Sequence, residues 1–472
     1  MECAIFNRGY YIIAPMHRYK LFASLLLLTL ACQFLVPGNP APAEYTVIAH
    51  PDGPLYAGDQ VSFEVLGPAS GENTEVVLSL DGDELGRARF GPFGVGGRRQ
   101  ATLWWAWDTR GLGPGSYTLD FSLAPNGPRW QETVELADRS RVPPPEPEAA
   151  WASLTTDCCV LHYITGTEAE RDLAELIAVT GEQAASVAAS MRVGFDAPVT
   201  ITFMPRVLGH GGFADGSIYV SYLDQNYTGD DTFQIIEHEM VHILDRQLGG
   251  QFRPTMFIEG LAVYVSGGHY KPEPLMARAA ALLELGRYIP ITSLADDFYH
   301  QQHEIGYLEA GALVGFMVET YGWEAFDAFY RQMEAGPDDS QAINAALQEH
   351  FGLSFSELER DFLAFLEDQA VTEAVREDLR LTILQFDTIR RYQQRLDPSA
   401  YFLTAWLPDG EIMRQRGIVA DFLRRPRRLP NQVVEYLLVQ VDTALGAQDF
   451  DRAEALLDTA NAILELYDLR FR

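Results

Sequence analysis

"IIEHEMVHILDRQLGG", from Ile235 to Gly250, places two histidines four residues apart with a glutamate after the first. The stretch is otherwise largely apolar and ends on paired glycines, which predicts an α-helix. Residues i and i+4 lie on one face of a helix, so His238 and His242 can direct two imidazoles at one ion. Glu239 is displaced by one position, where it can act on a water at the metal. Because zinc accepts imidazole nitrogen, the spacing predicts a Zn²⁺ site on this helix.

The following segment supplies a candidate third ligand. "LGGQFRP" (Leu248–Pro254) contains glycines that can turn the chain back, and "PTMFIEGLAVYVSG" (Pro254–Gly267) predicts a second helix with the proline near its first turn. Glu259 lies in this apolar helix, where an unpaired charge would be costly and a metal would explain it. A catalytic zinc site has three protein ligands and one open position. The alternative is a buried helix whose two histidines are satisfied without a metal.

The two segments together resemble the gluzincin metallopeptidases, in particular the domain called peptidase MA-like. That family has "HExxH" followed, after a short gap, by an "EGxAxY" helix, and "HEMVH" and "EGLAVY" (Glu259–Tyr264) match these motifs. "GGFADGSIYVSYL" (residues 211–223) occupies the place of the family's edge strand, which can hold a peptide by main-chain hydrogen bonds. The resemblance covers residues 158–370 and implies an α+β zincin-like fold. It implies Zn²⁺ held by His238, His242 and Glu259, with Glu239 as the general base.

A further helix extends the resemblance. "GYLEAGALVGFMVETYG" (residues 306–322) is similar to the helix in aminopeptidase-type gluzincins that begins with a tyrosine and small residues. Carried over, Tyr307 would stabilise the oxyanion; the alternative is a core tyrosine. The "GxMEN" strand of the aminopeptidases is absent, so an exopeptidase is not indicated. Asp245 could orient a metal ligand or lie on the helix surface. The loop histidines His210 and His269 receive no role.

The rest of the chain predicts a multidomain protein. Residues 44–138 contain short strands such as "QVSFEVLG" and "RQATLWWAW", separated by turns such as "DGDELG" and "GPFGVGG". This pattern predicts an all-β, immunoglobulin-like sandwich without chemistry of its own. Residues 139–151 form a Pro-rich linker, and residues 152–370 form the central α+β domain. Residues 371–472 are predicted to be helical, with a hairpin of the tetratricopeptide kind over residues 445–467 and "RRPRRLP" as a solvated loop.

The N-terminus predicts export. Residues 1–43 contain the basic "MHRYK", an apolar run and "APA", which together indicate a signal peptide. The alternatives are a lipoprotein signal ending at Cys32 and an N-terminal membrane anchor. Beyond this segment only Cys158 and Cys159 remain, and we interpret them as two small buried apolar residues rather than a disulfide. No later segment is long and apolar enough to cross a bilayer.

Charge and motifs together limit the function. The formal net charge is -31, which argues against nucleic acid as a partner and against an anionic membrane surface. The sequence therefore predicts an exported zinc metallopeptidase acting on a peptide or protein, and it leaves the oligomeric state open. Two alternatives remain: an exported binding or scaffold protein with a non-catalytic zincin domain, and a hydrolase of some other amide or ester.

Overall fold

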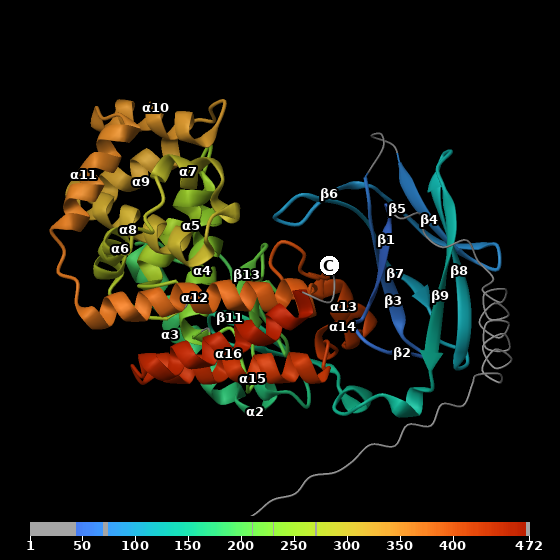
Figure 1. Cartoon of the computed structure of the whole chain (residues 1–472). Coiled ribbons are helices and arrows are strands. Elements are labelled where there is room, and N and C mark those ends of the chain that lie inside the picture. Colours follow the sequence, from blue (N-terminus) through green and yellow to red (C-terminus); the bar gives the residue numbers. More distant parts are fainter. Residues whose placement is uncertain (1–43, 69–73, 210, 230, 270, 469–472) are drawn as a thin grey trace, which may run out of the picture.

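The structure is a computed structural model that describes residues 44–68, 74–209, 211–229, 231–269 and 271–468 (Figure 1). The predicted signal peptide and His210 lie outside these ranges, so nothing tests export or an N-terminal anchor. Within the described ranges, no helix combines the length and apolar character that crossing a bilayer requires.

The N-terminal strands form two sheets that share one apolar core, and we call them the β module (Figure 1). One sheet has the order β1-β3-β7-β6 and the other the order β2-β9-β8-β4-β5. The strands are β1 (Thr46–His50), β2 (Leu55–Tyr56), β3 (Gln60–Leu66), β4 (Glu75–Leu80), β5 (Asp83–Arg89), β6 (Gly91–Phe93), β7 (Arg98–Asp108), β8 (Gly115–Ala124) and β9 (Arg129–Ala137). The immunoglobulin type of this sandwich stays a prediction.

Two segments predicted as turns are strands. "DGDELG" continues into β5, which pairs with β4, and "GPFGVGG" begins with β6, which pairs with β7. Both are edge strands whose side chains are mostly exposed or half-buried. They therefore lack the apolar alternation that marks a strand packed on a core, and backbone pairing alone defines them.

A third sheet, with the order β10-β11-β12-β14-β13, forms the base of the central part, and we call it the central sheet. Its strands are β10 (Trp151–Thr155), β11 (Cys159–Ile164), β12 (Val199–Met204), β13 (Gly212–Ala214) and β14 (Ile218–Ser221). β13 pairs only with β14, so the predicted edge strand is a hairpin with β13 on the outside. Trp151, the last residue of the predicted linker, already belongs to β10, and the linker contains the short turns η2 (Arg139–Arg141) and η3 (Glu146–Glu148).

The two cysteines correct an expectation, because a disulfide joins Cys158 to Cys159. Neighbouring side chains on a regular strand point to opposite faces, which would keep the two sulfur atoms apart. β11 begins only at Cys159, so Cys158 lies in the preceding turn and the alternation of a strand does not apply.

Helices cover one face of this sheet and continue into a helical body (Figure 1). They are α2 (Glu168–Arg171), α3 (Leu173–Ser190), α4 (Thr232–Leu248), α5 (Thr255–Ser266), α6 (Leu275–Glu284), α7 (Ile291–Asp296), η4 (Phe298–His300), α8 (His303–Tyr321), α9 (Trp323–Gln332), α10 (Asp339–Phe351) and α11 (Phe355–Glu367). α5 packs against both α4 and α8. Gly260 permits the close approach to α8, since a Cβ there would lie 2.6 Å from the carbonyl oxygen of Ala310.

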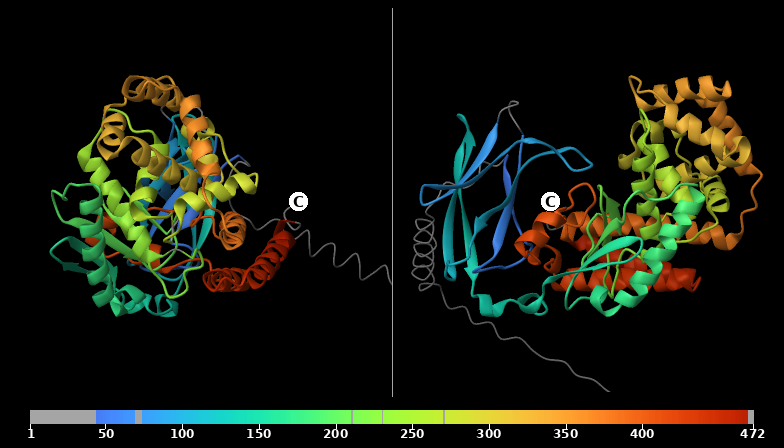
Figure 2. Two further views of the ribbon diagram at one scale, coloured as in Figure 1. Left: turned by 90° about the vertical axis from the view of Figure 1, so that its left-hand side faces the viewer. Right: turned by 180° about the vertical axis from the view of Figure 1, so that it is seen from behind.

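The C-terminal region contains α12 (Glu373–Leu396), α13 (Gly410–Arg416), α14 (Ala420–Leu423), α15 (Leu429–Gly446) and α16 (Phe450–Asp468). α15 and α16 form a helical hairpin whose turn lies near Asp449, as predicted. The predicted bounds are too short, because residues 445–467 contain only the end of α15 and most of α16. The tetratricopeptide type stays a prediction. The expectation of helix to the end is wrong for residues 397–409, which are irregular. We call residues 397–424 the return segment. It brings α13 and α14 between the β module and the central sheet (Figures 1 and 2).

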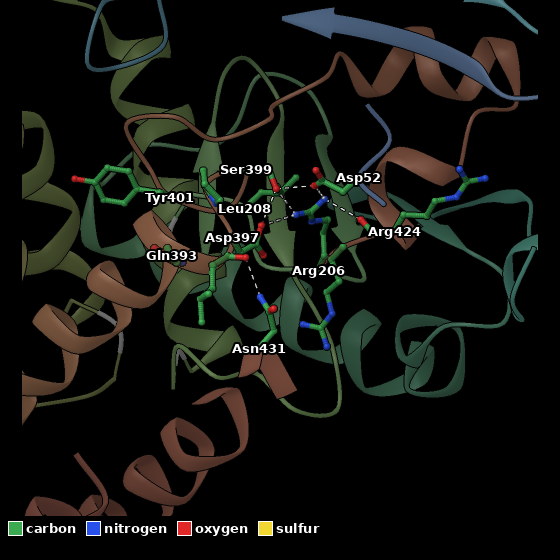
Figure 3. A network of polar contacts seen from close by, with 12 residues as sticks. Asp52, Arg206, Leu208, Gln393, Asp397, Ser399, Tyr401, Arg424 and Asn431 are labelled. Carbon is green, nitrogen blue, oxygen red and sulfur yellow. Dashed lines mark hydrogen bonds and ion pairs between the residues drawn. The ribbon is translucent and has the colours of Figure 1, made fainter. Parts of the chain in front are cut away.

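A buried polar network fixes these parts to one another (Figure 3). Arg206 follows β12, is 1% exposed, and donates to Asp52 of the β module, to Ser399 and to the carbonyl oxygen of Arg424. It also pairs with Asp397 at 3.5 Å. One guanidinium thus joins the β module, the central sheet and the return segment.

Arg424 belongs to "RRPRRLP", the segment predicted to be a solvated loop. That prediction is wrong for this residue, which is 6% exposed. Its guanidinium donates to Asp59 in the β module and to Glu146 in the linker. Both carboxylates lie several hundred residues from Arg424 in the sequence. The tertiary structure brings them to the guanidinium and buries these ion pairs.

Candidate metal centre

α4 carries the first two candidate ligands on one buried face. Asp231 caps the helix by accepting hydrogen bonds from the backbone N–H groups of Phe233 and Gln234, and the helix ends before Gly249, which has a φ of 74°. The helical spacing directs His238 and His242 to the same side, and their Nε2 atoms lie 3.1 Å apart. This agrees with the arrangement predicted from the motif.

α5 brings the third candidate to the same point. Oε2 of Glu259 lies 3.4 Å from Nε2 of His238 and 3.3 Å from Nε2 of His242. Ligand atoms at about 2.0–2.1 Å from a tetrahedral zinc ion are separated by roughly 3.3–3.4 Å. The three observed separations therefore fit a zinc-sized ion. The turn predicted at "LGGQFRP" makes this possible, since Gly249 and Gly250 both have positive φ and send the chain back onto α4.

The electrostatics of the three groups depend on one another. Burial lowers the pKa of His238 to about 4. Burial is also the largest single effect on His242 and acts in the same direction. The charge and hydrogen bond of Glu259, together with the charges of Glu239 and Asp245, outweigh it and raise the pKa of His242 to about 9. Burial opposes the charge of Glu259, yet His242 and His238 together hold the pKa of that carboxyl well below its usual range through their charges and hydrogen bonds. A neutral imidazole and a carboxylate are the forms that bind zinc, so one proton on His242 competes with the metal.

Glu239 lies beside the candidate ligands without joining them. It is 6% exposed and lines the same cavity. Burial raises its pKa to about 7, with a further contribution from the charge of Glu259. Among the described residues, no hydrogen-bond donor reaches its buried Oε2. A carboxylate with a free lone pair at this point can accept a proton from a water in the cavity.

Gly212 on β13 explains how the edge strand reaches this position. A Cβ there would lie 2.6 Å from Cγ2 of Ile235 and 3.3 Å from Cγ of Glu239. Only glycine lets the strand approach α4 so closely. The edge strand and the carboxylate therefore border the same space.

Tyr307 lies at the start of α8 and lines the cavity. Its ring centroid is 6.1 Å from that of His238, and its ring stacks on His269 at 4.0 Å. Burial raises the pKa of Tyr307 well above its ordinary value, so the hydroxyl keeps its proton. A protonated hydroxyl in this cavity is a hydrogen-bond donor, which is compatible with the oxyanion role and does not test it.

Sequence reasoning missed Tyr299 and His269. The hydroxyl of Tyr299 donates to Oε1 of Glu259 at 2.9 Å, which leaves Oε2 directed at the two histidines. Nδ1 of His269 lies 3.0 Å from the buried carboxylate of Glu304, which fixes the ring that supports Tyr307. No local pattern distinguishes Tyr299 from a core aromatic residue. His269 was visible as a histidine after the Glu259 helix, but only its contacts give it a position.

Asp245 has neither of the positions expected of it. It is 1% exposed, and its carboxylate accepts hydrogen bonds from Arg253, Arg331 and the hydroxyl of Tyr330. Both interpretations, a surface residue and a partner of a ligand histidine, are therefore wrong. Asp245 instead ties the turn after α4 to α9.

The candidate ligands open into a cavity of about 800 Å³. This size is typical of pockets that hold an extended small ligand. Its walls come from α4, α5 and α8, from the β13–β14 hairpin, from the return segment and from the β module. The space beside the three ligand atoms is thus accessible. A water and a substrate carbonyl can enter together, which hydrolysis requires.

No protein-family model matches the chain, and no curated protein matches it. Solved structures similar to it include an M1 zinc metallopeptidase from Deinococcus radiodurans, at 11% identity and a TM-score of 0.31, covering 70% of this chain and 94% of that one. Another is an aminopeptidase N family protein from Idiomarina loihiensis, at 10% identity and a TM-score of 0.31, covering 71% and 78% respectively. Structural similarity at this TM-score does not assign a function to the chain.

Proposed function

We propose that the chain is a zinc-dependent metallopeptidase that hydrolyses peptide bonds. One observation carries the proposal: two imidazole nitrogens and one carboxylate oxygen form a triangle with edges of 3.1, 3.4 and 3.3 Å beside an accessible cavity. His238, His242 and Glu259 would hold the ion. When bound, Zn²⁺ supplies a lowered pKa for water and polarisation of the scissile carbonyl.

The chain's own residues supply the remaining steps. Glu239 accepts the proton of the attacking water and then transfers it to the leaving amine. Tyr307 donates a hydrogen bond to the oxygen that becomes negative in the tetrahedral intermediate. Tyr299 keeps Glu259 in position through its hydroxyl. β13 offers a free strand edge beside Glu239, along which a peptide backbone can align.

The open cavity favours an enzyme over a non-catalytic scaffold. A non-catalytic metal site does not require a buried glutamate next to one of its ligands in the sequence. It also does not require space for a substrate beside the ligands. The edge of β13 favours a peptide over another amide or ester, because a small ester offers no backbone groups for the strand to pair with.

Replacement of Glu239 by Gln tests the mechanism. We expect the Glu239→Gln variant to bind zinc as the wild type does and to lose about 10²–10⁴-fold in kcat against a peptide library, since it keeps the shape and removes the base. Glu237→Gln is the matched control. Glu237 is on the same helix and nearly as buried, but its carboxylate accepts from Ser186 and does not line the cavity. If Glu239→Gln cleaves at the wild-type rate, Glu239 is not the base.

A further inference from the structure

The β module was expected to be an accessory, yet it forms one wall of the candidate catalytic cavity. Phe93, Val95, Trp104 and Trp105 line the cavity together with the candidate metal ligands. We infer that this wall is a substrate subsite for a large apolar side chain, aromatic above all, on a peptide bound at the metal centre. The inference rests on the proposed function and adds the class of peptide that the site selects.

An arm of the β module reaches over the cavity. The arm, residues 91–98, comprises β6 and the turn into β7, and it extends from the sandwich toward the central part (Figures 1 and 2). Its glycines permit contact with the return segment, since a Cβ on Gly96 would lie 3.3 Å from the side chain of Leu403. Val95 at its tip is 51% exposed although it is apolar. The arm therefore places an apolar, solvent-exposed side chain at the cavity.

A backbone irregularity directs Trp104 and Trp105 away from the core of the module, which holds Trp107 and Trp130. In a regular strand Trp104 and Trp105 would point to opposite faces, and one would enter the sandwich. The register of β7 shifts opposite Ser62, and Trp105 adopts a φ of 42°, which is costly for a bulky residue. Its N–H donates to the hydroxyl of Ser62 at 2.7 Å, which holds the bulge. As a result both side chains line the cavity.

Trp104 and Trp105 have different roles in this wall. Trp105 is 5% exposed and belongs to the apolar cluster between the β module and the central sheet, so it anchors the wall. Trp104 is only half-buried, and its ring packs against Trp406 at 4.6 Å, which itself stacks on His50 at 3.7 Å. This stack fixes Trp104 from behind while part of its surface remains open. A rigid aromatic surface binds an apolar group with little loss of conformational entropy.

The β13–β14 hairpin adds aromatic surface to the same cavity. Phe213 stacks on Tyr219 at 4.7 Å, and both line the cavity. Phe213 belongs to β13, the strand along which we propose that the peptide backbone lies. A peptide aligned there would project alternate side chains from the strand, and the aromatic walls suit large apolar ones. The cavity thus has aromatic walls on the β13–β14 hairpin and on the β module, and charged residues of the hairpin and the return segment, among them Asp215, Asp409 and Arg416, line it beside them.

The test compares peptides that differ only by Phe or Ala at one position, moved along the peptide on both sides of the scissile bond. We expect the wild type to prefer Phe at one position by about 10- to 100-fold in kcat/KM, as burial of such a side chain implies. Trp104→Ala should remove most of this preference, because the Phe peptide loses far more kcat/KM than the Ala peptide does. Val95→Asp changes an exposed side chain and should act in the same direction without a risk to folding. Leu429→Asp, an exposed apolar residue outside the cavity, is the control.

Two outcomes would overturn the subsite. The first is that the wild type cleaves Phe and Ala peptides equally at every position. The second is that Trp104→Ala lowers kcat/KM equally for both peptides while Val95→Asp lowers it for neither. Binding of the same peptides to the Glu239→Gln variant, measured by tryptophan fluorescence, separates the subsite from the chemistry. If no peptide is cleaved, but the Phe peptide binds more tightly than the Ala peptide and Trp104→Ala removes this difference in affinity, the proposed function fails and the subsite stands. If neither cleavage nor binding distinguishes the peptides, the subsite fails.

Discussion

Tyr299 offers a sharp test of the metal centre, because removal of one hydroxyl changes one contact. Its hydroxyl donates to Oε1 of the buried Glu259 at 2.9 Å. Tyr299→Phe keeps the ring and its contact with Phe298, so the fold should persist. A hydrogen bond to a charged group contributes about 1.5–3 kcal/mol, which corresponds to about 10- to 150-fold in an equilibrium constant. Loss of a residue that orients a metal ligand has an effect of similar size on metal affinity.

Competition with a chromophoric chelator measures the zinc affinity of the variant and the wild type. Tyr288→Phe is the matched control, since the hydroxyl of Tyr288 also donates to a carboxylate, that of Glu359 at 3.1 Å, away from the candidate ligands. We expect the zinc dissociation constant to rise by at least about tenfold in Tyr299→Phe and to stay unchanged in Tyr288→Phe. A Tyr299→Phe affinity within a factor of two of the wild type would refute the view that this hydroxyl orients Glu259.

Two further predictions concern the packing around the site. Gly260→Ala forces a Cβ against the backbone of Ala310, so it should destabilise the protein by about 1–3 kcal/mol and weaken zinc binding at the adjacent ligand. Gly181→Ala is the control: Gly181 lies in a helix, no atom lies within 4 Å of the new Cβ, and the change should be neutral or stabilising. Denaturant unfolding measures the stability of both variants. Equal stability of the two variants would contradict the role of Gly260. Arg206→Met leaves the buried Asp397 and the half-buried Asp52 without their cation and should cost about 3–5 kcal/mol, seen as a fall of the thermal midpoint of about 3–6 °C for a chain of this length. Arg87→Met removes only an exposed pair and should shift the midpoint little; a similar shift in both variants would deny the network its role.

Local patterns were sufficient for the helices of the site. The four-residue spacing of His238 and His242 and the apolar segment around Glu259 predict two helices, and the glycines between them predict the turn. These features depend on backbone periodicity and turn chemistry, which neighbouring residues decide. The sequence therefore predicted which side chains converge, and the structure brings those three together.

Contacts between distant segments were beyond such patterns. Tyr299 reaches Glu259 across 40 residues, and Arg206 meets Asp52 across 154. β5 and β6 were predicted as turns because edge strands are defined by pairing with a neighbouring strand. The disulfide of Cys158 was missed because Cys158 lies in a turn, outside the alternation of the strand. Asp245 shows the same limit: its partners belong to α9 and to the loop after α4, and nothing near it in the chain indicates them.

The sequence by itself determined how His238, Glu239 and His242 are placed relative to one another, because a helix of known period fixes that relation whatever surrounds it. Only the tertiary structure decided what the site faces. Trp104 and the arm enter the cavity because a strand bulge, a buried arginine network and the return segment hold the β module against the central sheet. Each of these is a contact between residues far apart in the chain, and folding alone brings them together.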